Sequence, residues 1–131
     1  MENMGIRRTF DEDYEAVLAR VPDALATEGF GVLTEIDVKA TLKKKLDVDF
    51  RRYKILGACN PPFAHKVLQA ELEIGLLLPC NVLVYEDDEG KTVVSAIDPI
   101  QMMASAGGAS PEIKAVADEV RQKLVNAMEK I

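Results

Sequence analysis

The chain has 131 residues, of which 48% are hydrophobic and 29% charged, so we expect residues 1–131 to form a single domain around one hydrophobic core. Aromatic residues are scarce and tryptophan is absent, so aliphatic side chains must build most of that core. The net charge of −6 argues against general nucleic-acid binding, because that activity needs clustered Lys and Arg side chains to replace the counterions of the phosphates.

A strand over residues 4–10 and a helix from Asp11 to Gly29 are predicted to open the fold. Asp11 is a suitable N-cap for this helix and Gly29 a suitable stop. Pro22 lies inside the pattern and should kink or split the helix, because proline removes a backbone donor. The apolar residues recur at helical spacing and form one stripe, which consists of Tyr14, Val17, Leu18, Val21 and Leu25.

The middle of the chain predicts two strands and two helices. Residues 30–36 favour a strand, and Asp37 then caps a short helix over residues 38–46. Residues 50–59 favour a third strand, which alternates basic and apolar residues at its start. The next helix has Asn60 as its expected N-cap, Pro61 as its first residue and Gly75 as its end. Its buried face is predicted to be Phe63, Val67, Leu68 and Leu72, with Ala64 as a further candidate.

The C-terminal third begins with the clearest hairpin of the chain, in which strands 79–86 and 91–97 flank the turn "DDEG". Asp98 is expected to cap a short helix over residues 100–105, and "AGGAS" over residues 106–110 to be a flexible loop. Ser110 and Pro111 should open a last helix that ends at residue 129. The stripe of this helix is Ile113, Val116, Ala117, Val120, Leu124 and Met128.

The main elements therefore follow the order β-α-β-α-β-α-β-β-α. Interleaved strands and helices with a tight hairpin near the end predict an α+β fold: a mostly antiparallel five-stranded sheet with helices packed on one face. A small α/β sheet with parallel crossovers is the alternative.

Three segments, "GACNPPFAHKVL", "LPCNVLVYED" and "AIDPIQMM", carry a family resemblance at these relative spacings. Together with the helical first and last segments, they resemble the bacterial and archaeal domain-of-unknown-function family three hundred and two over nearly the whole chain. The resemblance implies a TATA-binding-protein-like or helix-grip-like α+β fold, often seen as a homodimer. It implies no activity, and the likeness to a TATA-binding protein concerns the fold alone.

Cys59 is the candidate for chemistry, because it lies at a strand end just before a helix N-terminus. Free N–H groups and partial positive charge at such a position favour the thiolate and can hold an anion. The alternative is that Cys59 serves as a small buried hydrophobe, as free cysteines often do. Asn60 could bind a ligand, although helix capping by acceptance from Phe63 N–H explains it more simply.

Cys80, at the start of the fourth strand, meets Cys59 only if the two strands are antiparallel. A parallel arrangement would separate the cysteines by roughly 20 Å. The spacing of the two cysteines differs from redox and compact zinc motifs, so neither a disulfide nor a metal site is expected. His65 is predicted to face solvent, because Phe63 and Val67 mark the buried side of its helix.

Other polar and sulfur-containing residues have simpler structural explanations. Asp98 fits a helix cap, and the adjacent Met102 and Met103 fit packing, since neighbouring helix positions point about 100° apart. The basic stretch from Lys39 to Lys54 fits a solvated surface, an anion site or a charge-complementary dimer contact. Walker, dinucleotide-binding and HExxH motifs are absent, so the sequence names no cofactor.

We expect a cytoplasmic protein without a membrane segment, because the N-terminus lacks an apolar signal region and the longest apolar run, residues 74–80, is too short to span a bilayer. There the thiols of Cys59 and Cys80 stay reduced.

Three functional hypotheses follow. The first is a homodimeric module that binds a small ligand or partner near Cys59, Asn60 and Pro61, with Cys80, Asn81 or Asp98 adjoining. The second is a thiol-dependent enzyme or redox protein that uses Cys59, with Cys80 or His65 as its partner. The third is a purely structural or interaction protein. Whether the chain is an enzyme is left open.

Overall fold

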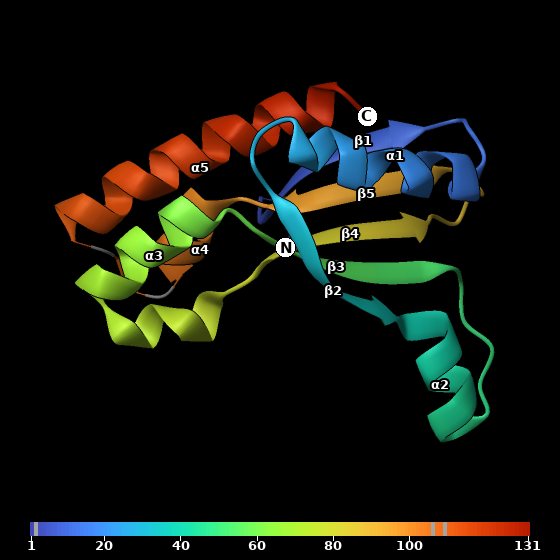
Figure 1. The fold of residues 1–131 in the computed structure, drawn as a ribbon. Helices are drawn as coiled ribbons and strands as arrows, with labels where there is room; N and C mark the ends of the chain where they lie inside the picture. Colours follow the sequence, from blue (N-terminus) through green and yellow to red (C-terminus); the bar gives the residue numbers. More distant parts are fainter. Residues whose placement is uncertain (2, 106, 109) are drawn as a thin grey trace.

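The computed structural model describes residues 1, 3–105, 107–108 and 110–131 of the chain. Its helices and strands are drawn in Figure 1. In chain order they are β1 (Gly5–Phe10), α1 (Tyr14–Ala26), β2 (Gly31–Asp37), α2 (Val38–Leu46), β3 (Tyr53–Cys59), α3 (Pro61–Ala70), the 3₁₀ helix η1 (Leu72–Leu77), β4 (Cys80–Glu86), β5 (Thr92–Ile97), α4 (Pro99–Ser105) and α5 (Pro111–Glu129).

The five strands form one sheet in the order β1-β5-β4-β3-β2. Among the described residues, every pair of neighbouring strands is antiparallel. The predicted α+β fold with an antiparallel five-stranded sheet is therefore confirmed, and the alternative with parallel crossovers is wrong. The β4–β5 hairpin fits the predicted turn, where Asp87 accepts backbone hydrogen bonds from Glu89 and Lys91.

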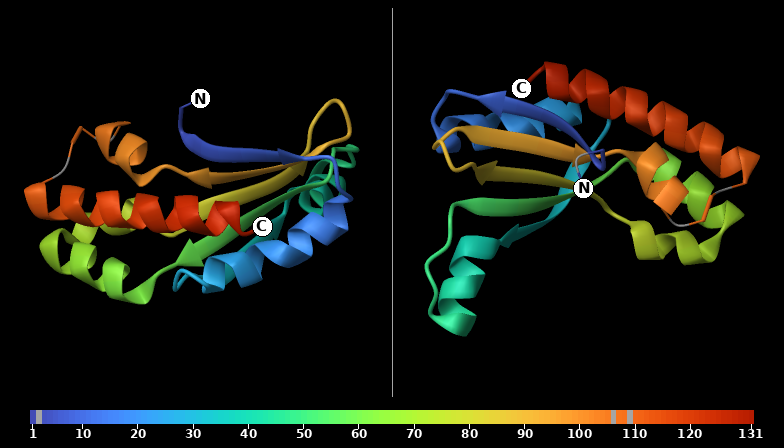
Figure 2. Two further views of the ribbon diagram at one scale, coloured as in Figure 1. Left: turned by 90° about the horizontal axis from the view of Figure 1, so that it is seen from above. Right: turned by 180° about the vertical axis from the view of Figure 1, so that it is seen from behind.

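Helices α1 and α5 cover one face of the sheet, and in the described part of the chain no helix lies over the middle of the other face (Figure 2). Val82 and Val84 of β4 and Leu56 of β3 point into the covered face and are buried. The phenol of Tyr14 in α1 donates to the carbonyl of Val84 at 2.8 Å and fixes this helix over the centre of the sheet. The core thus lies between the sheet and the two helices.

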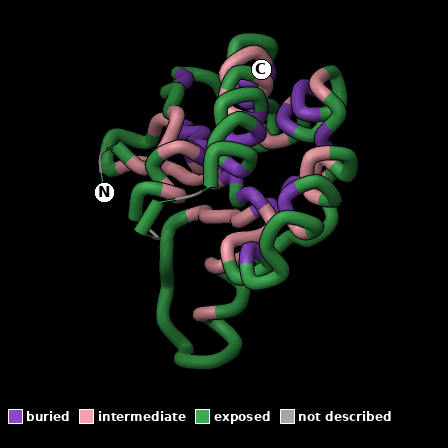
Figure 3. Tube along the Cα trace, turned by 90° about the vertical axis from the view of Figure 1, so that its left-hand side faces the viewer, coloured by how far each residue is buried: buried purple, intermediate pink, exposed green. Residues whose placement is uncertain are grey.

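The remaining helices lie at the two ends of the sheet. Helices α3 and α4 and the turn η1 lie at one end, beside the first half of α5, whereas α2 projects away from the opposite end (Figure 1). No residue of α2 is buried. The projecting part of the trace in Figure 3, which holds α2 and the loop after it, is correspondingly almost wholly exposed. The prediction that helices pack on one face thus holds for α1 and α5.

Of the predicted N-caps Asp11, Asp37 and Ser110, the last two are confirmed and the first is wrong. Asp37 accepts from Ala40 N–H and Ser110 from Ile113 N–H, as expected for N-caps. The cap of α1 is Asp13, which accepts from the N–H groups of Glu15 and Ala16, and not Asp11. The prediction failed because the helix begins at Tyr14, so Asp11 lies too early to reach its first turn.

The predicted course of α1 and α3 also needs correction. Helix α1 is continuous through Pro22, so of the two predicted effects of this proline, a kink or a split, the split is wrong. Helix α3 ends at Ala70, before the predicted end at Gly75, and the chain continues as η1. Because the helical phase is lost at this point, Leu72 is 82% exposed and not part of the buried face.

The C-terminal helix α5 has the predicted bounds, and its six predicted stripe residues are all buried. The long amphipathic pattern explains this agreement, since a stripe repeated over several turns leaves only one face that can pack on the sheet. Of the predicted loop before α5, Ala106 and Ala109 lie outside the described residues. No helix of the described chain is both long and apolar enough to cross a membrane.

Candidate functional site

An apolar cavity of about 350 Å³ lies where β3 ends and α3 begins. One wall is the inner face of α3, with Phe63, Val67 and Leu68. The facing wall is the first half of α5, which contributes Val116 and Val120. Residues of β2, η1, β4 and α4 close the remaining sides. No Asp, Glu, Lys, Arg or His belongs to the described residues that line the cavity. A cavity of this size and character suits a small apolar molecule.

Cys59 and Cys80 lie at the same end of the sheet and both line this cavity. Strands β3 and β4 are antiparallel, and Ala58 is the register partner of Cys80, so Cys59 lies one residue beyond. Both thiols are free. Cys59 is partly exposed, whereas Cys80 is buried.

The two thiols differ in chemistry because their burial differs. Burial raises the pKa of the Cys80 thiol to about 11, and the nearby Cys59 acts in the same direction. At neutral pH Cys80 is therefore a protonated, apolar wall residue and a poor nucleophile. Of the two cysteines, only Cys59 is accessible enough to meet a molecule that enters from solvent.

The pKa of Cys80 predicts an alkaline loss of stability. The unfolded thiol ionises near pH 9 and the folded thiol near pH 11. The contribution of this thiol to the free energy of unfolding is therefore fully present below pH 9 and is lost as the pH rises through 11. A shift of this size corresponds to about 2 to 3 kcal/mol. Urea unfolding at pH 8 and pH 11 measures the loss, and Cys80→Ala should make the pH dependence shallower by that amount. An equally steep dependence in Cys80→Ala would contradict the prediction.

Asn60 lines the cavity, but its predicted role as a helix cap is wrong. Its side chain makes no capping hydrogen bond. The Nδ2 atom instead donates to the carbonyl of Glu28 at 3.2 Å. Pro61 and Pro62 have no N–H to be capped, so the amide is free to tie the β3–α3 corner to the connection between α1 and β2. Sequence gives no signal for this contact, because the two residues are far apart in the chain.

Two other candidates lie outside the cavity lining. Asn81 is an exposed residue of β4. Asp98 is buried: its Oδ1 accepts from Ile100 N–H at 2.9 Å, as the predicted cap does, and its Oδ2 accepts from Arg121 Nε at 2.9 Å. Asp98 thus fixes α4 to α5 beside the cavity. His65 is exposed on α3, as predicted.

The α5 wall of the cavity was not predicted from the sequence to belong to the site. Ile113, Val116, Ala117 and Val120 were identified only as the stripe that packs in the core, yet their side chains also line the cavity. Phe30 and Leu33, from the start of β2, were likewise missed. The sequence carries no signal for these residues, because their apolar side chains resemble ordinary core residues, and the 68% exposure of Leu33 is known only from the structure.

The basic stretch from Lys39 to Lys54 is far from the cavity and is largely neutralised. Arg51 pairs with Asp88, Arg52 with Glu86 and Lys54 with Glu35. Lys43 pairs with Asp47 and Asp49, and Lys39 donates to the carbonyl of Phe50. Like Lys39, Lys44 and Lys45 form no ion pair with any described residue, and they carry positive charge at the tip of α2.

Within the described part of the chain, no three His, Cys, Asp or Glu side chains come together as metal ligands would.

Comparison with known proteins adds a family and a solved structure. The family model described as "Domain of unknown function DUF302" matches residues 6–131. The chain is similar to the crystal structure of an uncharacterized conserved protein DUF302 from Bacillus stearothermophilus, with 27% identity, a TM-score of 0.87 and coverage of 98% of both chains. No curated protein matches the chain.

Proposed function

The chain belongs to the DUF302 family of domains of unknown function, and from its cavity we propose that it is a small-ligand-binding module. The observation that carries the proposal is the cavity of about 350 Å³ between α3, α5 and the end of the sheet. Its apolar wall supplies the driving force for binding, because a bound apolar molecule leaves water. Cys59, Asn60 and Cys80 are the candidate site residues in its wall, and Asn81 and Asp98 would contact a ligand only outside it.

A cavity-filling substitution tests this proposal. Ala64 of α3 lines the cavity, whereas Ala70, the last residue of the same helix, is exposed and does not. We expect wild-type protein to bind the neutral fluorescent probe N-phenyl-1-naphthylamine. Ala64→Phe should weaken this binding at least about tenfold, because loss of even a part of the buried apolar contact is worth more than 1.4 kcal/mol. Fluorescence titration measures both dissociation constants.

Ala70→Phe is the matched control, since it adds the same side chain to the same helix outside the cavity. It should bind the probe as wild type does, and circular dichroism should show that both variants are folded. The proposal fails if wild type does not bind the probe, or if the two variants bind it equally well.

A thiol-dependent enzyme is the second candidate function, favoured by the partly exposed Cys59 in the cavity wall just before the N-terminus of α3. Cys80 is a poor redox partner in this scheme because it is protonated at neutral pH. The enzyme hypothesis requires Cys59 to react with iodoacetamide faster than free cysteine does, and a slower reaction removes it. A purely structural role stays the alternative if no ligand and no reactive thiol are found.

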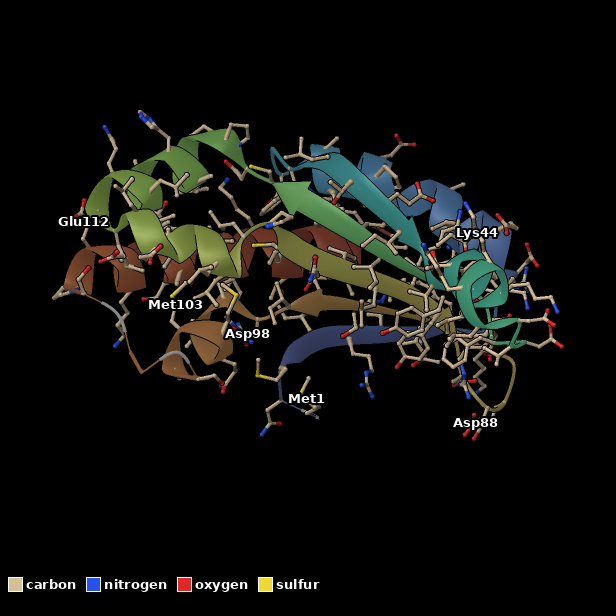
Figure 4. The ribbon with its side chains drawn as sticks, turned by 90° about the horizontal axis from the view of Figure 1, so that it is seen from below. Met1, Lys44, Asp88, Asp98, Met103 and Glu112 are labelled. Carbon is tan, nitrogen blue, oxygen red and sulfur yellow. The ribbon has the colours of Figure 1, made fainter. Side chains whose placement is uncertain are left out.

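We further propose that a second copy of the chain covers the open face of the sheet. This face carries a cross-strand row of Ile36, Ile55 and Leu83, which are register partners and point away from α1 and α5. Ile36 is 49% exposed. Figure 4 shows this face, with Lys44 at one end and Glu112 at the other.

Charge complementarity supports a two-fold, antiparallel stacking of two such faces. In this arrangement Lys44 and Lys45 of one copy approach the acidic end of the other, where Glu71, Glu73 and Glu112 are exposed. Light scattering should give twice the chain mass of 14.4 kDa, and Leu83→Glu should reduce it to that of one chain. A wild-type protein with the mass of a single chain contradicts the dimer.

We place the protein in the cytoplasm, a proposal that its two free thiols support.

A further inference from the structure

Two lysines from different helices converge on one aromatic ring of the cavity wall. The ammonium of Lys66 in α3 lies 5.7 Å from the ring centroid of Phe63, and that of Lys123 in α5 lies 5.9 Å from the same centroid. Phe63 itself lines the cavity. The only cations that contact this ring in the described chain thus lie at the boundary between the apolar cavity and the surface.

Neither ammonium is neutralised by a carboxylate of the described chain. Lys43, Lys54, Lys91 and Lys130 all form ion pairs, whereas Lys66 and Lys123 form none. Hydrogen bonds from Asn126 and Lys130 lower the pKa of the Glu28 carboxyl, and the charge of Lys123 adds to this effect without forming an ion pair. A contact with the face of an aromatic ring stabilises each cation only weakly at a surface site, by about 0.5–1 kcal/mol. Two ammonium groups without a carboxylate partner at one ring therefore create a positive potential beside the cavity, which favours an anion there.

The cavity interior is apolar, in contrast to the positively charged boundary beside Phe63. Its described lining contains no charged side chain, so an ionised group placed deep inside would lose its hydration without a partner. An aliphatic chain, in contrast, would gain from burial against Val67, Val116 and Val120. A ligand that satisfies both regions must have an apolar body and one charged end.

We propose that the ligand is an amphiphile with a single aliphatic chain and one negatively charged head group, such as a carboxylate. The chain occupies the cavity, and the head group lies beside Phe63, where the ammonium groups of Lys66 and Lys123 attract it. This inference rests on the proposed function, since it specifies the class of molecule that the same cavity binds. It assigns recognition of the charge to two lysines that line no part of the cavity themselves.

Decanoate and decanol test the assignment, because they share one aliphatic chain and differ at the head. Isothermal titration at low ionic strength should show that wild type binds decanoate at least tenfold more tightly than decanol. The double variant Lys66→Gln/Lys123→Gln should lose this preference and keep its affinity for decanol. Arg20→Gln/Lys91→Gln is the matched control, since it also removes two positive charges, at residues that line no part of the cavity and take no part in the proposed dimer contact, and it should keep the preference.

The outcomes separate this inference from the proposed function. The assignment of the head group is overturned if wild type binds the two ligands equally well, or if the double variant keeps the preference for decanoate. In either case, binding of decanol still supports a ligand cavity. Absence of binding by decanoate, decanol and the fluorescent probe overturns the cavity function itself. Should the double variant not fold, Lys66→Gln alone decides, because Lys66 is exposed and a preference unchanged in that variant contradicts the proposal.

Discussion

Replacing Leu124 by alanine should lower the free energy of unfolding by about 3 kcal/mol, the middle of the range for fully buried leucines. Leu124 lies in α5 and is 0% exposed, within the cluster that joins this helix to α1 and the sheet. The substitution removes the apolar contacts of the side chain and leaves a void that the surrounding close-packed residues fill only in part. Urea unfolding at neutral pH measures the change.

The chain contains a matched control for this experiment. Leu72 is 82% exposed, so Leu72→Ala makes the same chemical change without opening a void. It should alter the free energy of unfolding by less than about 0.5 kcal/mol. Similar losses in the two variants would mean that α5 does not pack over the sheet as described here, and would also remove one wall of the proposed cavity.

Replacing Asp98 by alanine should cost about 2 to 3 kcal/mol, less than the loss of a fully buried ion pair because Arg121 is half-exposed. The substitution removes the cap on Ile100 N–H and the hydrogen bond from Arg121 Nε. Asp98→Ala, Arg121→Ala and the double variant form a thermodynamic cycle, and we expect a coupling energy above about 1 kcal/mol between the two residues.

The same substitution should weaken ligand binding, because the ion pair connects two walls of the cavity. Pro99 and Val120, the neighbours of Asp98 and Arg121 in the chain, both line it. Probe affinity should fall several-fold in Asp98→Ala although no ligand contact is removed. Additive losses of stability in the cycle, or unchanged probe binding, would show that the pair does not hold α4 against α5.

The features predicted correctly from sequence are those that local physics determines. The stripe of α5 extends over several turns, and the caps Asp37 and Ser110 act within three residues of their partners. The hairpin of β4 and β5 is also local, since its turn joins adjacent strands. Where the phase of a helix was broken by a short turn, as at Leu72 after α3, the prediction failed because periodicity does not reveal where a helix gives way to a 3₁₀ turn.

The candidate site was found in part, through its thiols. Cys59 and Cys80 stood out by residue type, and the sequence already showed that they could meet only between antiparallel strands. That they share one cavity wall depends on the register of β3 with β4, which places Ala58 opposite Cys80. Sequence patterns alone do not specify this register in a chain whose strands lie far apart along the sequence.

The α+β class and the principal helices and strands follow from the sequence, because periodicity, capping and turn residues act over a few positions, and three short segments carry the resemblance to the family. Three contacts depend on how the elements pack in space: the hydrogen bond that Asn60 donates, the pair of Asp98 with Arg121, and the approach of Lys66 and Lys123 to the ring of Phe63. The contacts Asn60–Glu28, Asp98–Arg121 and Lys123–Phe63 each join residues more than twenty positions apart. The cavity is defined by such contacts, since it is the space left where α3, α5 and the end of the sheet fail to close on one another.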